Sequence, residues 1–287
     1  MAQFILTGFD LETFVRETLA EDLGVGLPDG GRDVTSESVI PSDARFSGVM
    51  DSRDPIRVAG LPIAEAFFRA LDPEMEIELL VQDGDAVSAG TDLMRLSGNA
   101  RAMLTAERCA LNTVQHLSGI ATMVRQYVDV MDNPDCTLLD TRKTIPGLRH
   151  LEKYAVRMGG GSNHRMGLWD AAMIKDNHVL VAGNVGEAVR RAVSAGVAEI
   201  ICEVDRIDQI EPALQAGATR LLLDNMEPVT LREAVGLVAG RVPTEASGGI
   251  NLDTIKAKAA TGVDYVSVGR LTQSAPAADV GLDFTPL

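Results

Sequence analysis

Polar residues or glycines follow each of six short strand-like runs beyond Cys136. The runs are 137–139, 171–174, 199–204, 220–223, 244–246 and 265–268. The residues that end or follow them are Asp140, Thr141, Arg142, Lys143, Lys175, Glu203, Asp224, Ser247, Gly248, Gly249, Gly269 and Arg270. In α/β barrels, side chains at the carboxyl ends of the strands form the active site. Six polar ends that converge on one mouth therefore indicate a binding or catalytic site.

The turn formed by Ser247, Gly248 and Gly249 suits a phosphate group. Its glycines leave backbone N–H groups unobstructed, and a helix is expected to begin near Leu252. Gly269 follows the next strand, and many α/β barrels hold a phosphate after their last two strands. A simple tight turn is the alternative interpretation of the paired glycines.

Glu203 and Asp224 end neighbouring strands of the expected sheet, so their carboxylates should lie side by side. Like charges raise each other's pKa unless a cation separates them. A magnesium ion that chelates a polyphosphate is the expected partner of such a pair. The alternative is a salt bridge to Lys175 or Arg142.

A basic segment lies within a strongly acidic chain. The formal net charge is −15, which argues against a protein that coats nucleic acid or an anionic membrane. Between Arg142 and Lys175, however, seven basic residues stand against two acidic ones. Arg142, Arg165 and Lys175, together with His164, suit the carboxylates and phosphates of small anions. A solvated helix face is the alternative for this segment, although three consecutive glycines within it fit a helix poorly.

The spacing of apolar residues predicts the elements that position these groups. Helical periodicity at 185–195, 207–216, 228–239 and 252–260 alternates with the apolar runs, and this order predicts an α/β barrel. Before about residue 105, helices at 11–23 and 63–71 and strands at 44–50, 76–81 and 92–96 predict a smaller mixed unit.

A long helix is predicted from Thr105 to Met131, with Arg108 in its first turn. A cation is unfavourable near the positive end of a helix dipole, so we expect an external anion near Arg108. A surface arginine without a role is the alternative.

The cysteine content and the apolar runs indicate the cellular setting. The three cysteines lie far apart without a CxxC spacing, which favours a reducing cytoplasm over a zinc site or a disulfide framework. No apolar run approaches the length of a membrane span, and no basic residue precedes Arg16 as in a signal peptide. We therefore expect a soluble cytoplasmic protein that binds neither a membrane nor a nucleic acid.

These groups together describe a barrel enzyme whose mouth binds a phosphate, a metal-chelated group and a compact polyanion. A ribose phosphate donor and a dicarboxylate acceptor satisfy each part of this description. The residues alone lead no further.

Several segments in fixed order closely resemble quinolinate phosphoribosyltransferases. The segments are Thr105–Arg108, Leu117–Thr122, Asp140–Thr144, Pro146–Arg149, Leu151–Val156, Gly159–Gly161, Asn163–Arg165, Ile174–His178, Glu245–Ile250 and Gly262–Asp264. The resemblance extends over nearly the whole chain. It implies an α/β fold with an N-terminal α/β sandwich domain at residues 1–108, completed by a tail at 272–287, and an incomplete α/β barrel at 109–271. It also implies a homodimer in which each barrel faces the partner's sandwich and receives Arg108 from it.

The resemblance further implies a reaction and roles for individual residues. Quinolinate and phosphoribosyl pyrophosphate, with magnesium, would give nicotinate mononucleotide, pyrophosphate and carbon dioxide in NAD biosynthesis. The quinolinate carboxylates would be held by Arg142, His164, Arg165, Lys175 and Arg108. Lys143 would face the pyrophosphate, Glu203 and Asp224 the metal and ribose, and Ser247, Gly248 and Gly269 the 5-phosphate. Thr141, Gly249, Arg270 and Gln273 complete the expected substrate-binding set, and the catalytic set is Lys143, Lys175, Glu203 and Asp224.

Three positions depart from the pattern of the family. Gln273 stands where a histidine near the phosphate is usual, so this contact would be neutral. Arg270, where a smaller residue is more common, is expected to compensate. Ile201 replaces a frequent glutamate, and it is assigned no role in the site.

Three other functions fit parts of the sequence. A Schiff-base lyase that uses Lys175 would need neither magnesium nor a phosphoribosyl donor. A molybdenum-transport-associated relative of the family would act on a different substrate, although the segments around His164 and Lys175 are intact. A non-catalytic binding protein is the third, and the complete set of charged strand ends disfavours it.

Overall fold

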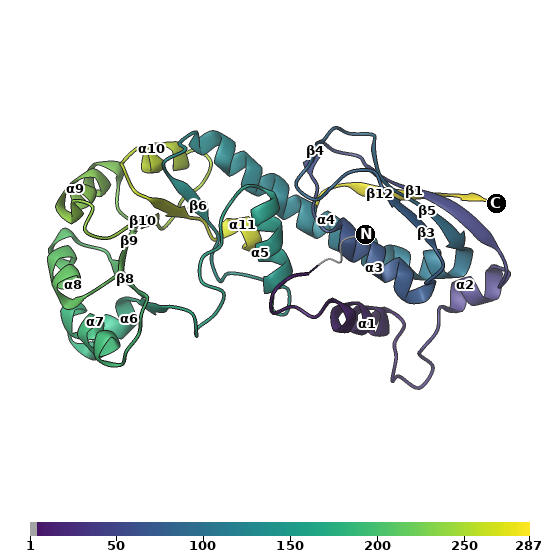
Figure 1. Cartoon of the computed structure of the whole chain (residues 1–287), viewed down its shortest axis with the longest axis horizontal. Helices are drawn as coiled ribbons and strands as arrows, with labels where there is room; N and C mark the ends of the chain where they lie inside the picture. The colour runs from purple at the N-terminus through teal and green to yellow at the C-terminus, as the bar shows by residue number, and fades with distance from the viewer. Residues whose placement is uncertain (1–4) are drawn as a thin grey trace. The chain divides into compact units, whose positions relative to one another are not determined.

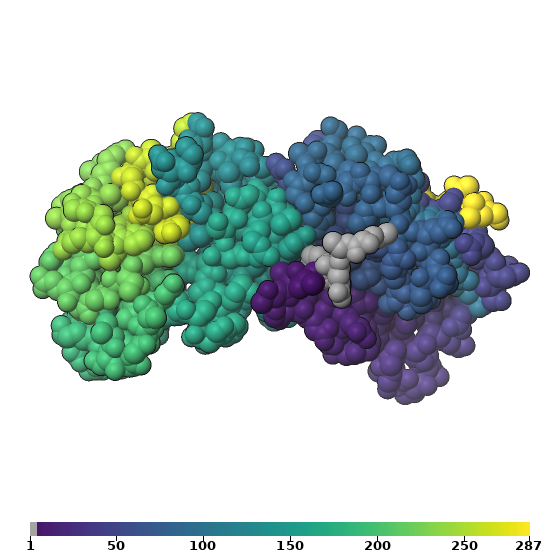
Figure 2. Space-filling view, viewed as in Figure 1, coloured from purple at the N-terminus to yellow at the C-terminus, as the bar shows by residue number. Residues whose placement is uncertain are grey.

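The computed structural model describes residues 5–287 and separates the chain into two compact units. The first unit contains the chain up to Met123 together with 150–159 and 275–287. The second unit contains 124–149 and 160–274. The C-terminal part of the chain, drawn in yellow, reaches the surface of both units (Figure 2). No helix in the described part of the chain is long and apolar enough to cross a membrane.

An antiparallel sheet in the order β12-β1-β5-β3 forms the first layer of the first unit (Figure 1). Its strands are β1 (Arg45–Ser52), β3 (Glu76–Leu79), β5 (Thr91–Asn99) and β12 (Val280–Pro286), and a separate pair is formed by β2 (Ile56–Arg57) and β4 (Ala86–Val87). Met50 of β1 lies opposite both Met94 of β5 and Leu282 of β12. The end of the chain thus completes the sheet, as the resemblance implies.

Five helices lie wholly or partly in the described part of the first unit. They are α1 (Leu11–Asp22), α2 (Val34–Val39), α3 (Leu61–Leu71), α4 (Ala100–Met131) and α5 (Arg149–Met158), and α1 contacts α3. Asp10 caps α1, as its position before the helix suggests, by accepting a hydrogen bond from the backbone N–H of Thr13 at 3.2 Å. Phe67 and Phe68 of α3 are fully buried, and such aromatic side chains contribute much of the free energy of burial.

The long helix α4 begins at Ala100, not at Thr105 as the periodicity indicates. Oδ1 of Asn99, the last residue of β5, accepts a hydrogen bond from the backbone N–H of Ala102 at 3.1 Å. Asn99 thereby caps the helix, which begins at the next residue. Arg108 therefore lies two turns inside the helix, beyond the reach of the terminal dipole. The prediction that Arg108 lies in the first turn is wrong, so the helix dipole gives no reason to expect an anion there. The Arg108 side chain is 61% exposed.

The second unit is an open parallel sheet in the order β6-β11-β10-β9-β8-β7. Its strands are β6 (Thr137–Leu139), β7 (Ala172–Ile174), β8 (Ile200–Val204), β9 (Arg220–Asp224), β10 (Thr244–Ser247) and β11 (Tyr265–Ser267). All six strands appear where the apolar runs predict them. β6 and β7 lie at the two edges and do not pair with each other, so the barrel is incomplete, and the predicted fold class is confirmed.

Helices follow the outer side of the curved sheet (Figure 1). They are α6 (Asp176–Ala182), α7 (Val185–Ser194), α8 (Ile210–Ala216) after the 3₁₀ turn η1 (Ile207–Gln209), α9 (Pro228–Val238), α10 (Ile255–Ala259) and α11 (Arg270–Gln273). Each joins two parallel strands except α11, which leads into the tail. The carboxyl ends of all six strands therefore lie at one edge of the sheet.

Part of the basic segment is structural. Residues 150–159 belong to the first unit, where Glu152 and Lys153 of α5 are fully buried. Glu152 Oε1 lies 2.9 Å from His116 Nε2 of α4. The hydroxyl of Tyr154 donates to Asp83 Oδ2 at 2.7 Å. The predicted domain boundary at residue 108 stays a prediction. The compact units divide within α4, where the chain has no loop signal, and at the two ends of α5.

Replacing Tyr154 with phenylalanine should loosen the attachment of α5 to the first unit. Asp83 also accepts hydrogen bonds from the backbone N–H groups of Gly60 and Leu61, and burial raises its pKa. We expect Tyr154→Phe to lower the free energy of unfolding by about 1–2 kcal/mol, because a buried acceptor loses a donor. Urea unfolding measures this change. Tyr127→Phe is the matched control, since Tyr127 is buried as a residue and its hydroxyl has no hydrogen bond to residues 5–287, and equal effects of both variants would contradict the prediction.

Candidate active site

A pocket of about 780 Å³ opens at the carboxyl ends of the strands in the second unit. The predicted site residues that line it are Thr141, Arg142, Lys143, His164, Arg165, Lys175, Glu203, Asp224, Ser247, Gly248, Gly249, Gly269, Arg270 and Gln273. Of the predicted set, only Arg108 lies elsewhere, on α4 in the first unit. The pocket lining also includes residues that the sequence analysis does not assign: Met173, Leu222, Asn225, Glu245, Ile250, Asn251, Ser267 and Val268.

Two glycines shape one end of the pocket. Gly248 and Gly249 both have positive φ values, +90° and +62°, and a Cβ on Gly248 would lie 2.2 Å from Asn225 Oδ1. The backbone N–H of Asn225 donates to the carbonyl of Ser247 at 3.0 Å, which joins the tips of β9 and β10. The helix expected from Leu252 begins only at Ile255, so the glycine turn itself, and not a helix end, lines this part of the pocket.

Two guanidinium groups lie close together in the pocket. Burial, followed by the charge of Arg142, lowers the pKa of Arg165. Nη1 of Arg165 donates to the carbonyl of Ala171 at 2.8 Å, which fixes the side chain. Nε of Arg142 is buried without a hydrogen-bond partner in the described part of the chain. An anion between the two side chains would relieve their repulsion and accept the unused donor.

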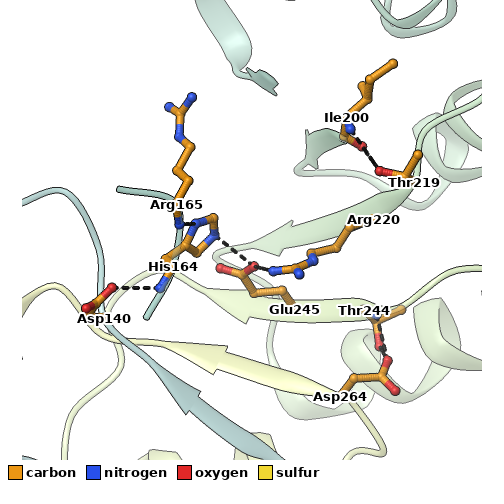
Figure 3. Close-up of polar contacts among 9 residues, drawn as sticks. All are labelled: Asp140, His164, Arg165, Ile200, Thr219, Arg220, Thr244, Glu245 and Asp264. Carbon is orange, nitrogen blue, oxygen red and sulfur yellow. Dashed lines mark hydrogen bonds and ion pairs between the residues drawn. The ribbon is translucent and has the colours of Figure 1, made fainter. Parts of the chain in front are cut away.

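His164 has protein partners at both ring nitrogens (Figure 3). Its Nδ1 accepts the backbone N–H of Arg165 at 2.8 Å, and its Nε2 lies 3.2 Å from Glu245 Oε2. Its own backbone N–H donates to Oδ1 of the buried Asp140 at 2.8 Å. The predicted contact of this ring with a substrate carboxylate stays a prediction.

Lys175 and Glu203 form an ion pair across the ends of β7 and β8. The salt bridge considered as an alternative for Glu203 is therefore present in this structure. Asp224 ends the adjacent strand β9, and its Oδ2 accepts a hydrogen bond from Asn225 Nδ2 at 2.5 Å. Both carboxylates line the pocket. Among residues 5–287, no group of three or more His, Cys, Asp or Glu side chains is placed to hold a metal ion.

Two polar residues position the loop that carries Arg142 and Lys143. The hydroxyl of Thr272 donates to the carbonyl of Lys143 at 2.8 Å. Nε of Arg149 donates to Thr144 Oγ1 at 3.1 Å, and its Nη1 donates to the carbonyl of Met166 at 3.1 Å. Arg149 thus connects the loop after β6 with the loop that carries Arg165. Neither Arg149 nor Thr272 is predicted as a site residue, because hydrogen bonds from these side chains to neighbouring loops produce no recognisable pattern in the sequence.

Cysteine chemistry does not fit the pocket. Cys202 precedes Glu203 on β8 and is fully buried. Burial, together with the charge of Glu203, raises the pKa of its thiol to about 12. The thiolate required for nucleophilic attack is therefore nearly absent at neutral pH.

The remaining groups have the character of a transferase that acts on a phosphate-bearing donor and an acidic acceptor. A glycine turn, a carboxylate pair and a guanidinium pair line one pocket. Such a pocket can hold two anions in contact and stabilise charge that develops between them.

Comparison with known proteins identifies the family. The N-terminal domain of quinolinate phosphoribosyl transferase matches residues 33–118, and its C-terminal domain matches residues 120–283. The probable carboxylating nicotinate-nucleotide pyrophosphorylase of Bacillus subtilis is 40% identical over 96% of this chain and 93% of its own length. The carboxylating enzyme of Mycobacterium leprae is 42% identical over 94% of this chain and 95% of its own length. A crystal structure of NadC from Streptococcus pyogenes is 35% identical, with a TM-score of 0.93 over 99% of both chains. The chain belongs to the quinolinate phosphoribosyltransferase family.

Gly248 provides a test of the glycine turn. We expect Gly248→Ala to displace Asn225 and weaken the binding of ribose 5-phosphate by at least about tenfold, because a Cβ cannot fit at 2.2 Å. Isothermal titration calorimetry measures the affinity. Gly249→Ala is the matched control, since it introduces the same strain of a side chain at positive φ without the clash: a Cβ there has nothing within 4 Å. An unchanged affinity in Gly248→Ala would contradict a phosphate site at this turn.

Proposed function

We propose that the protein transfers the phosphoribosyl group of phosphoribosyl pyrophosphate to quinolinate and releases pyrophosphate and carbon dioxide, forming nicotinate mononucleotide for NAD biosynthesis. The observation that carries this proposal is the convergence of the glycine turn, the carboxylate pair and the guanidinium pair in one pocket. Membership of the family supports the same reaction.

The acceptor is proposed to bind between Arg142 and Arg165, with Lys175 nearby. Quinolinate carries two adjacent carboxylates, and planar guanidinium groups bind carboxylates through two parallel hydrogen bonds. The unused Nε donor of Arg142 and the lowered pKa of Arg165 both fit an anion at this place. Binding of a carboxylate to Lys175 would also compete with Glu203 for the ammonium group.

The donor is proposed to bind with its 5-phosphate at Ser247, Gly248 and Gly269 and its pyrophosphate near Lys143. Thr141, Gly249, Arg270 and Gln273 complete the surroundings. Gln273 contributes no charge to this end, and Arg270 is the nearby cation that would compensate.

Magnesium fits the donor chemistry of this pocket. Carboxylate oxygens are preferred magnesium ligands, and such ions commonly use one or two protein carboxylates together with substrate phosphates. Glu203 and Asp224 would hold the ion, and the pyrophosphate would supply the remaining oxygens. When bound, magnesium would neutralise charge on the departing pyrophosphate.

In the proposed reaction, the pyridine nitrogen attacks C1 of the ribose while the bond to the pyrophosphate oxygen breaks. The leaving group takes the electron pair, and positive charge develops on the sugar near Glu203 and Asp224. Loss of the 2-carboxylate follows as carbon dioxide, and the cationic ring nitrogen stabilises the electrons left on the ring until a proton replaces the carboxylate. Holding two anions together against their repulsion is the main contribution of the pocket.

A Schiff-base mechanism at Lys175 receives no support from the site. The Nζ of Lys175 is ion-paired with Glu203, so it is held by a carboxylate and not placed to attack a carbonyl group. The full length of the match to carboxylating enzymes also separates this chain from a non-catalytic binding protein.

The proposed assembly is a cytoplasmic homodimer in which Arg108 of each subunit completes the acceptor site of its partner. The Arg108 side chain is free to reach outward, since it is 61% exposed and lies 4.0 Å from Glu107. Leu168, Trp169, Leu180 and Val181 of the second unit are also exposed, and exposed apolar residues of this size are typical of interfaces.

Release of carbon dioxide tests the reaction directly. We expect the protein to release labelled carbon dioxide from carboxyl-labelled quinolinate only when phosphoribosyl pyrophosphate is present. Removal of divalent cations with EDTA should stop the release, and added magnesium should restore it. Folded protein that releases no label under these conditions would overturn the proposed function.

Mixing two inactive variants tests the shared site. Arg108→Ala and Lys175→Ala should each be inactive alone, because each removes a cation from every acceptor site. After subunit exchange, heterodimers regain one complete site, so roughly one quarter of the wild-type activity should return. The measurement is carbon dioxide release after mixing. Failure to regain activity, with exchange verified by native mass spectrometry, would exclude a contribution of Arg108 across the interface.

A further inference from the structure

Glu245 is a buried carboxylate beside the pocket that the reaction above does not use. It lies on β10, has no exposed surface and also lines the pocket. Its Oε2 lies 3.2 Å from His164 Nε2 and 3.5 Å from Nη1 of Arg220 (Figure 3). His164 lies in the loop before β7 and Arg220 lies on β9, so Glu245 connects this loop with that strand.

Glu245 is ionised in the folded protein. Burial alone would raise its pKa, but the hydrogen bond with His164, the hydroxyl of Ser267 and the charge of Arg220 outweigh burial and lower the pKa. Arg220 stacks on Tyr265, with Cζ 4.5 Å from the ring centroid, and so remains in place as the counter-charge. Buried charges of this kind are stable only when they are paired.

The partners of His164 determine its tautomer. A backbone N–H can only donate, so Nδ1 must accept from Arg165, and the ring proton resides on Nε2. An ionised carboxylate can only accept, so Glu245 matches this tautomer and excludes the other. The ring is therefore neutral and fixed in orientation by groups on both sides.

The fixed ring in turn positions Arg165. The backbone of Arg165 is bonded to the ring, the backbone of His164 is bonded to Asp140, and Nη1 of Arg165 is bonded to the carbonyl of Ala171. These three hydrogen bonds fix the backbone of His164, the backbone of Arg165 and the guanidinium group of Arg165. Loss of the Glu245 contact would leave the buried Nε2–H without its acceptor and free the ring to rotate.

We propose that Glu245 is a positioning residue for the acceptor half of the site: it holds His164 as the Nε2–H tautomer and thereby directs the guanidinium of Arg165. The inference rests on the proposed function, because it assigns Arg165 to the acceptor. It differs from the expectation that His164 itself holds a carboxylate, since both ring nitrogens are used within the protein.

Two variants of Glu245 distinguish the effect of its hydrogen-bond acceptor oxygen from the effect of its negative charge. Glu245→Leu removes the acceptor and should raise the KM for quinolinate roughly tenfold, the effect of one hydrogen bond to a buried charged group, while the KM for the donor stays within about twofold. Glu245→Gln keeps one acceptor oxygen for Nε2–H and should restore most of the acceptor affinity. Equal increases in both Michaelis constants, or no increase in Glu245→Leu, would overturn the proposal.

Asp264→Asn is the matched control. Asp264 accepts from the backbone N–H and hydroxyl of Thr244 at 2.7 and 3.0 Å, and Thr244 directly precedes Glu245 on β10 (Figure 3). This variant should lower the melting temperature without changing the ratio of the two Michaelis constants. A changed ratio in Asp264→Asn would mean that any disturbance of β10 alters acceptor binding, and the specific role of Glu245 would be lost.

Histidine NMR provides a readout that needs no activity. The chain has four histidines, so ¹⁵N-histidine labelling with one His164→Gln comparison assigns the ring of interest. We expect a neutral Nε2–H form for His164 in the wild-type protein. An Nδ1–H form or a charged ring near neutral pH would overturn the proposal even if Glu245→Leu fails to fold. If wild-type protein releases no carbon dioxide while the NMR result holds, the proposed function fails and the network stands.

Discussion

Repulsion between like charges is the constraint on which this pocket depends. Arg142 and Arg165 lie close enough for one to lower the pKa of the other, in a chain whose overall charge is strongly negative. Cations without a bound ligand attract carboxylates of the same protein, and Lys175 forms such an ion pair with Glu203. The acidic group whose charge acts on Arg165 is Asp170, and it accepts hydrogen bonds from the backbone N–H groups of Met166 and Gly167. Two buried carboxylates of the same unit also have partners: Asp140 accepts from a backbone N–H, and Glu245 is shared between His164 and Arg220. The pair therefore stays available for an external anion.

The fold provides this arrangement because parallel strands bring distant segments to one edge. Residues from Thr141 to Gln273 meet in a single pocket, although most are far apart along the chain. Hydrogen bonds between neighbouring loops then set the details, as between Asn225 and Ser247 or through Arg149. Strand pairing determines which residues meet, and loop hydrogen bonds determine how they point.

The parts that the sequence predicts correctly are those with strong periodicity or turn chemistry. The six parallel strands, most of the helices between them and the strand-end residues follow from apolar runs and their polar ends. The predicted start of α4 is wrong because the last residue of β5, Asn99, also caps the helix, and the spacing of apolar residues does not mark this boundary. Glu245 escapes notice as a site residue because a carboxylate inside a short apolar run gives no sign of which partners it meets. The burial of Lys153 is equally hidden, since local charge indicates solvent and tertiary packing decides otherwise.

The chain passes between its two units four times, after residues 123, 149, 159 and 274. Helix α4 begins in one unit and ends in the other, and α5 returns to the first unit from within the second. Neither unit therefore corresponds to a continuous stretch of gene. A single crossover between the coding regions of β1 and β12 would therefore combine strands of different origin in one sheet.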